Sequence, residues 1–207
     1  MSIDLRCFTY VNILQPQTAG FLGTISQGYH PLEGDAALFV EVSPGMDINI
    51  VTDIALKQTD VKPGIQVVER LYGALELHHR DQSQISAAGD AILTKLKVKE
   101  SERLKPKIIS EQIIHGTEGY HSQLVNRMRH GNFLHENDTL YVLEVHPAGY
   151  ALIATNEAEK AANIEVLEFR AIGAFGRVYL GGNEAEIDEA AKAIRSALSE
   201  IDGRPNS

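Results

Sequence analysis

The feature that most constrains this chain is an internal repeat. The segment Asp35-Ala-Ala-Leu-Phe-Val-Glu-Val-Ser-Pro44 resembles Asp138-Thr-Leu-Tyr-Val-Leu-Glu-Val-His-Pro147, and both begin with Asp and end in Glu-Val-x-Pro. The two glutamates of these segments, Glu41 and Glu144, lie 103 residues apart (144 minus 41). A fixed spacing between similar segments is typical of a duplicated structural unit. The chain is therefore predicted to contain two copies of one domain.

The same offset relates other positions in the two halves. Further on it slips to 102, as a one-residue deletion would produce. The matched pairs are Gly28 with Gly131, Ala55 with Ala158, Lys57 with Lys160, Gly73 with Gly176, Asp81 with Asn183, and Ile85 with Ile187. We predict domains at 1–104 and 105–207, joined by the charged segment 100–107. With 207 residues in all, each copy is long enough to form its own core.

Hydrophobic periodicity predicts the strands of the first copy. Leu5–Val11 alternates as a strand with one buried face should, and Leu38–Val42 is a continuous apolar strand. Two further strands are predicted at Ile65–Val68 and Tyr72–Leu77. A helix after Pro44 is predicted from one apolar stripe, formed by Ile48, Val51 and Ala55.

Capping residues mark the other helices. Thr18–Gln27 has helical spacing, and Gly28 is expected to end that helix with a positive φ. Asp81 with Gln84 is expected to form a capping box, as are Asn183 and Glu186 at the matched place in the second copy. Each copy then has the order β–α–β–α–β–β–α. This order predicts an α/β (α+β) fold of two ferredoxin-like sandwiches, each with helices on one face of its sheet.

Charge and hydropathy exclude several classes of protein. The net charge of -9 argues against non-specific nucleic-acid binding, which requires a basic surface. No apolar run approaches the roughly 20 residues needed to cross a bilayer, and no signal-peptide core is present, so a cytoplasmic protein is expected. The lone Cys7 lies in the first predicted strand and is expected to be a buried, inert thiol.

The sequence contains no motif for catalysis or metal binding. A GxSxG elbow and a phosphate-binding loop are both absent, and the eight histidines do not follow a metal-site spacing. We therefore predict no catalytic residue, no metal and no cofactor. Glu41 and Glu144 are the best pair of acids for an enzyme, but their matched positions in two repeats indicate repeated structure instead.

Several segments in both repeats carry a resemblance to a known family. They are Gln15–Thr18, Gly34-Asp35, Thr52–Lys57, Gly64–Gly73, Arg103–Pro106, Asn156–Ala162 and Gly173–Gly182. With these segments the chain resembles the circularly permuted tandem-domain shell proteins of bacterial microcompartments, in particular the carboxysomal type. Each copy begins with the strand and helix that close an ordinary shell domain, which is the permutation of this family.

The resemblance implies a structural shell protein of the carboxysome, located in the cytoplasm within that shell. Three chains would form a homotrimer, a pseudohexameric tile that meets other shell proteins at its edges. Family members also stack two trimers face to face. The tile would have a gated central pore for anionic metabolites such as ribulose bisphosphate and 3-phosphoglycerate.

Glu69-Arg70 aligns with the family's gating pair at the central pore. If this segment is extended, the two side chains point to opposite sides, and a rotation of the backbone would exchange them. The alternative is a solvated surface pair. The matched pair Ile172-Gly173 has no charge. Only one of the two domains in each chain would then contribute charged residues, so the ring of charges around the pore would be threefold and not sixfold. Gly173 and Gly176 fit either close backbone approach near the axis or a turn.

Lys57 and Lys160 recur at the same place in both copies. In shell domains a lysine at this place often lies at the edge of the tile, so both are edge candidates, the alternative being ordinary solvated lysines. A different class of function is a small-molecule-binding regulatory protein built from two ferredoxin-like domains, which the fold alone does not exclude.

Overall fold

The computed structural model describes residues 3–128 and 130–206. The chain forms two compact units. Unit 1 comprises residues 1–105 together with 202–207, and unit 2 comprises residues 106–201. The C-terminal segment, which the repeat pattern groups with the second copy, thus packs with the first unit.

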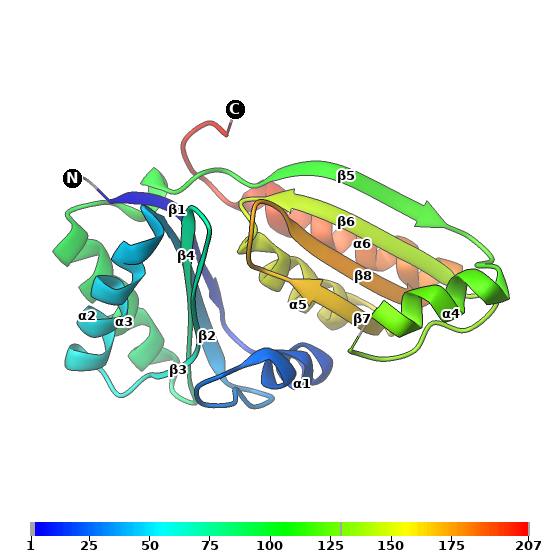
Figure 1. Ribbon diagram of the computed structural model, residues 1–207, viewed down its shortest axis with the longest axis horizontal. Coiled ribbons are helices and arrows are strands. Elements are labelled where there is room, and N and C mark those ends of the chain that lie inside the picture. The colour runs from blue at the N-terminus through cyan, green and yellow to red at the C-terminus, as the bar shows by residue number, and fades with distance from the viewer. Residues whose placement is uncertain (1–2, 129, 207) are drawn as a thin grey trace. The chain divides into compact units, whose positions relative to one another are not determined.

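The element order β–α–β–α–β–β–α is confirmed in both units (Figure 1). The short 3-10 helix η1 (Gly45–Asp47) precedes the second helix of unit 1, α2 (Ile48–Gln58). A second one, η2 (Glu100–Glu102), follows the third helix, α3 (Gln82–Leu96). Unit 1 consists of β1 (Asp4–Val11), α1 (Pro16–Ile25), β2 (Ala36–Ser43), α2 (Ile48–Gln58), β3 (Lys62–Glu69), β4 (Tyr72–His79) and α3 (Gln82–Leu96). Unit 2 consists of β5 (Lys107–Ile114), α4 (Gly119–Met128), β6 (Thr139–His146), α5 (Tyr150–Ala161), β7 (Glu165–Arg170), β8 (Gly176–Gly182) and α6 (Glu184–Glu200).

Each unit has one four-stranded antiparallel sheet with the same topology. The strand order is β1-β2-β4-β3 in unit 1 and β5-β6-β8-β7 in unit 2. Even the irregularities repeat. The register shifts at Arg6 in β1 and at Ile109 in β5, and again at Gly64 in β3 and at Leu167 in β7. Both pairs keep the offset of 103, so the repeat extends to individual β-bulges.

The core of unit 1 lies between its sheet and two helices. Figure 1 shows α2 and α3 together on one face of the β1–β4 sheet. The core contains apolar residues from these helices and from β1, β2 and β4, among them Phe8, Leu38, Val51, Leu75 and Ile92, all fully buried. The buried residues of α1 lie outside this cluster. The prediction of helices on one face therefore holds for two of the three helices.

The helix caps were predicted in part. Asp81 accepts a hydrogen bond from the Ser83 amide, and Asn183 accepts one from the Glu186 amide, so both residues cap their helices. The other half of each predicted capping box, in which the Gln84 or Glu186 side chain would accept from the backbone N–H of the capping residue, is wrong. The Gln84 side chain accepts from the Asp60 amide at 3.0 Å, and the Glu186 side chain accepts from the Asn163 amide at 2.8 Å. In both units the side chain at this position thus accepts from a backbone N–H in the loop after the preceding helix, and not from a backbone N–H at the start of its own helix.

The expected role of Gly28 is also wrong. α1 ends at Ile25, and no positive φ occurs at Gly28. A Cβ built at Gly28 would instead lie 2.2 Å from the Pro63 carbonyl oxygen, and one at Gly131 would lie 2.2 Å from the Val166 oxygen. Both glycines let a loop pack directly against the edge strand of the sheet, where the Gly28 amide donates to the Gly64 oxygen.

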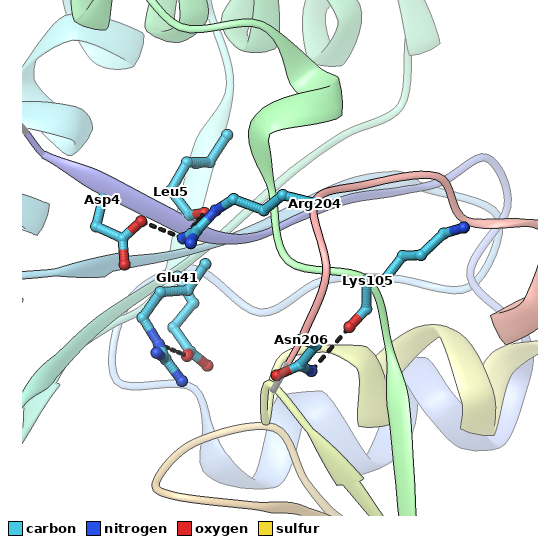
Figure 2. Close-up of polar contacts among 7 residues, drawn as sticks. Asp4, Leu5, Glu41, Lys105, Arg204 and Asn206 are labelled. Carbon is cyan, nitrogen blue, oxygen red and sulfur yellow. Dashed lines mark hydrogen bonds and ion pairs between the residues drawn. The ribbon is translucent and has the colours of Figure 1, made fainter.

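The C-terminal segment is fixed to unit 1 by its polar contacts (Figure 2). Arg204 pairs with Asp4 and also donates to the backbone oxygens of Leu5 and Glu102. The Asn206 amide group donates to the Lys105 oxygen at 2.8 Å. The segment thus fastens the start of β1 to the residues that follow α3.

Within residues 3–128 and 130–206, none of the helices combines the length and the apolar character needed to cross a bilayer.

Candidate functional site

The candidate gate pair lies at the β3–β4 hairpin. Glu69 is the last residue of β3 and pairs with Tyr72, the first residue of β4. Arg70 and Leu71 form the two-residue turn between them. Arg70 has a φ of 56°, in the left-handed region that residues with a Cβ, apart from Asn, Asp and His, rarely adopt. The premise that both residues lie in an extended segment is therefore wrong for Arg70, because a tight turn between strands requires the left-handed conformation there.

The matched position of unit 2 also has a positive φ. Gly173 corresponds to Arg70 by the offset of 103 and has a φ of 110°. No atom lies within 4 Å of a Cβ built at Gly173, so this glycine meets a backbone requirement of its loop and not a close approach within the chain. Arg70 thus occupies a position that a glycine fills without strain in the other copy.

The two turns differ in how far their strands pair. In unit 1 the pairing continues to Glu69 and Tyr72. In unit 2 the pairing of these two strands ends at Arg170 and Arg177. The five residues 171–175 between β7 and β8 form a loop that contains Ile172. The charged turn is therefore the tighter of the two.

The side chains of the charged turn face solvent. The Arg70 side chain is 90% exposed and that of Glu69 is 49% exposed, with 3.8 Å between Arg70 Nε and Glu69 Oε1. An exposed pair at this distance contributes little to stability. The guanidinium group is therefore available for contacts outside this chain.

The base of the turn is fixed by a glycine contact. A Cβ at Gly73 would lie 2.1 Å from the Gly45 oxygen and 2.6 Å from the Ile48 Cβ. Gly176, its match in unit 2, approaches the Ala148 oxygen in the same way, at 2.3 Å from the built Cβ. This contact lies within unit 2, so the close approach of Gly176 near an axis stays a prediction. In unit 1 the hairpin base therefore lies against the η1 segment.

A buried ion pair lies on the other side of the hairpin base. Arg6 Nε lies 2.7 Å from Glu41 Oε1, and the side chains are 8% and 1% exposed. Glu41 lies on β2, which pairs with β1, and Figure 2 shows its side chain with a dashed line at the carboxylate. The Arg6 guanidinium also lies 3.6 Å from the centre of the Tyr72 ring. Arg6 is thus held between a carboxylate and the aromatic residue that closes the turn.

In unit 2 the matched glutamate has an arginine from a different strand. Glu144 Oε1 accepts from Arg177 Nε of β8 at 3.0 Å, whereas Ile109 stands at the position of Arg6. Each of the two acids considered for an enzyme is therefore held by an arginine of its own unit. This geometry fits a structural role for both glutamates.

Glu76 and His78 on β4 form another buried polar pair of unit 1. His78 Nδ1 lies 3.1 Å and 3.2 Å from the two Glu76 oxygens, and the Gly64 amide donates to Glu76 at 3.1 Å. Burial raises the pKa of the Glu76 carboxyl, an effect that the His78 hydrogen bond opposes. Both side chains are enclosed, which fits a structural role and not an exposed binding group.

Comparison with known proteins decides the family. Residues 5–102 match the sequence family of the CsoS1D N-terminal domain. The carboxysome shell protein CcmP of Synechococcus elongatus is 48% identical over 204 residues, which are 99% of this chain and 96% of that protein. The chain belongs to the CcmP and CsoS1D family of carboxysome shell proteins. Membership in this family places it in the carboxysome shell.

Two solved shell proteins of the RMM microcompartment have the same fold. A fused permuted hexameric shell protein is 46% identical with a TM-score of 0.94, covering 97% of this chain and 99% of that one. A double ringed trimeric shell protein is 37% identical with a TM-score of 0.95, covering 99% of this chain and 100% of that one. The predicted fold of two permuted shell domains is thus confirmed.

The edge candidates of this shell protein lie on exposed helix surfaces. Lys57 of α2 pairs with Asp53 at 2.7 Å, and Lys160 of α5 pairs with Glu157 at 3.2 Å. The two lysine side chains are 73% and 63% exposed. They occupy matched places on their helices, apart in sequence from the two turns.

Two other features concern expected chemistry. Cys7 is fully buried, as predicted from its strand position. Among residues 3–128 and 130–206, the histidine, cysteine, aspartate and glutamate side chains nowhere gather into a group of three that could hold a metal ion.

The sequence reasoning missed Arg6, Glu41 and Tyr72 as a group. One signal was available, because Arg6 interrupts an otherwise buried strand and a buried guanidinium requires a partner. The identity of that partner depends on strand order, which the repeat alone does not specify.

Proposed function

We propose that this chain is a structural tile of the carboxysome shell, formed by a cyclic homotrimer whose six domains surround a gated central pore. Family membership supports the role in the shell. A 37% identical relative is described as a double ringed trimer and a 46% identical one as hexameric, which supports threefold closure and stacking of two trimers face to face.

The pore is proposed to contain three copies each of Glu69 and Arg70. The observation that carries this is Arg70 in its left-handed turn, because the second copy has glycine at the same place. A strained, solvent-exposed arginine at a position that glycine fills without strain points to selection for its side chain and not for folding. Ile172 and Gly173 would then form the uncharged, alternate positions of the ring.

The chemistry of this ring favours anions. Guanidinium groups match carboxylate and phosphate oxygens in two-point contacts, and their charge persists at any physiological pH. With Arg70 paired to Glu69 of a neighbouring subunit the opening is blocked, and with the pair folded back it is wide. Permeant metabolites are proposed to be phosphorylated sugars and acids such as ribulose bisphosphate and 3-phosphoglycerate.

Charge reversal in assembled shells tests the pore. Arg70→Ala and Arg70→Glu are expected to alter the entry of a sugar bisphosphate into shells loaded with an enzyme that consumes it, with Arg70→Glu slowing entry most. The matched control is Lys192→Ala, which removes an exposed lysine from α6 and is expected to leave entry unchanged. Identical entry rates for all four proteins would contradict gating by Arg70.

Lys57 and Lys160 are proposed to lie at the edges of the tile. Their exposure and their equivalent places in the two copies support contacts repeated around a pseudohexagonal perimeter. The double variant Lys57→Ala/Lys160→Ala is expected to form trimers but fewer sheets in electron micrographs. Sheets as extensive as those of the wild type would contradict the edge role.

The role is proposed to be structural and not catalytic. Each of the matched acids Glu41 and Glu144 is held by an arginine of its own unit. Turnover of a phosphorylated or carboxylate substrate by the purified protein, lost when either acid is replaced, would overturn this part of the proposal.

A further inference from the structure

The charged turn has a support that the uncharged turn lacks. In unit 1 the Arg6 guanidinium lies 3.6 Å from the centre of the Tyr72 ring, and Tyr72 is the strand partner of Glu69. At such a distance a partly desolvated guanidinium over an aromatic face is a favourable contact. A residue of β1 therefore contacts the closing pair of the hairpin directly.

Arg6 is itself fixed from the other side. Its Nε lies 2.7 Å from Glu41 Oε1 on β2, and Arg6 sits at a β-bulge, which turns one extra side chain out of the regular alternation. Glu41 in turn lies opposite Ala74 of β4. Ala74 thus stands where unit 2 has Arg177, the arginine that pairs with Glu144.

The matched hairpin of unit 2 has no arginine at the bulge. Ile109 occupies the matched bulge, and Glu144 is held by Arg177 from β8. Phe175, at the place of Tyr72, packs edge-on against the His146 ring at 5.9 Å and pairs with no strand residue. Two strand pairs that close the unit 1 hairpin are open here. The arginine at the bulge and the closed turn occur together.

We propose that Arg6 is a positioning residue for the Glu69-Arg70 turn, acting through the ring of Tyr72. Glu41 orients Arg6, Arg6 holds Tyr72 in its strand position, and Tyr72 keeps the hairpin closed up to Glu69. Motion of the hairpin is thereby confined to the turn residues Arg70 and Leu71, so that the Arg70 guanidinium keeps a defined distance from the sheet. The importance of this for passage rests on the proposed pore, whereas the mechanical coupling does not.

Hydrogen exchange of the hairpin amides in the full-length protein tests the coupling. Tyr72→Leu removes the ring and leaves the Arg6–Glu41 pair in place, and the amides of residues 67–74 are expected to exchange about tenfold faster. Tyr72→Phe keeps the aromatic face, so it is expected to stay within about twofold of the wild type. Amides of α3 serve as an internal reference, because a general loss of stability would accelerate them as well.

A second pair of variants removes the arginine without stranding a buried charge. Arg6→Leu/Glu41→Leu replaces the whole ion pair by apolar side chains, which a buried site tolerates better than a single removal. It is expected to accelerate the same hairpin amides, and adding Tyr72→Leu to it is expected to have little further effect. The matched control, Glu144→Leu/Arg177→Leu, is expected to leave residues 67–74 unchanged.

Two readouts distinguish this inference from the proposed function. Unchanged hairpin exchange in Tyr72→Leu and in Arg6→Leu/Glu41→Leu would overturn the positioning role, whatever the shells let through. Faster hairpin exchange together with unaltered entry of sugar phosphates would support the positioning role while counting against the pore. Equal acceleration of hairpin and α3 amides would also overturn the inference, since Arg6 would then act on the fold as a whole.

Discussion

Replacing Arg70 by glycine separates the needs of folding from those of function. At a φ of 56°, a residue with a Cβ loses about 1 to 2 kcal/mol relative to its preferred conformation. Glycine removes this strain. It also gives the unfolded chain more freedom, which costs about 0.5 to 1 kcal/mol.

The side-chain contacts of Arg70 add little to this comparison. Its guanidinium is 90% exposed and its ion pair with Glu69 spans 3.8 Å, so solvent screening leaves roughly 0 to 1 kcal/mol. The three contributions nearly cancel. Arg70→Gly is therefore expected to change the free energy of unfolding by no more than about 1 kcal/mol in either direction.

The reciprocal change at the matched turn has the opposite expectation. Gly173 has a φ of 110° and open space around a built Cβ. Gly173→Ala therefore introduces backbone strain without a clash and is expected to destabilise the protein by roughly 1 to 3 kcal/mol.

Urea unfolding followed by circular dichroism measures both effects. All proteins are compared at one protomer concentration, because assembly adds to apparent stability. A loss of more than about 2 kcal/mol in Arg70→Gly would refute the reasoning, since the arginine would then be required by the fold. Arg70→Ala, which keeps the strain and removes the charge, serves as the control for the ion pair.

Three further changes probe the support of the site. Gly73→Ala is expected to destabilise the protein by about 1 to 3 kcal/mol, because the new methyl group meets the Gly45 oxygen; an unchanged thermal midpoint would contradict this. Glu76→Gln is expected to flatten the pH dependence of the free energy of unfolding. Because the pKa of the Glu76 carboxyl is raised in the native protein, the stability that the protonated carboxyl contributes is lost as pH rises from the ordinary 4.5 through the raised value. Urea unfolding at several pH values that gives the same pH dependence for both proteins would be evidence against this. Arg204→Ala removes the contact with Asp4 and is expected to increase proteolytic cleavage of the C-terminal segment, with equal cleavage of the wild type as the contrary result.

The repeat made most of the fold predictable. An offset of 103 aligned both copies, and the helix caps Asp81 and Asn183 marked the last helix of each unit in advance. Periodicity located the strands because one face of each sheet is buried against helices. The strands on either side of Arg70 were located from their periodicity. Arg70 itself was expected in an extended segment, and its left-handed turn was not foreseen, since arginine gives no sign of a positive φ.

Contacts between distant segments were beyond such reasoning. Gly28 looked like a helix terminator, and its role against the edge strand depends on how a loop packs. The pairing of Glu41 with Arg6, and of Glu144 with Arg177, uses arginines from different neighbouring strands, so aligning the repeats hides it. The C-terminal residues that contact unit 1 lie outside the pattern shared by the two copies.

The position of Arg70 in the assembled protein tests the central claim most directly. A cryo-electron microscopy reconstruction of the full-length shell protein is expected to show three chains around one axis, with the three Arg70 side chains bordering its narrowest opening. An assembly in which the β3–β4 turns point to the outer rim, or a protein that stays a single chain at all concentrations, would contradict the account.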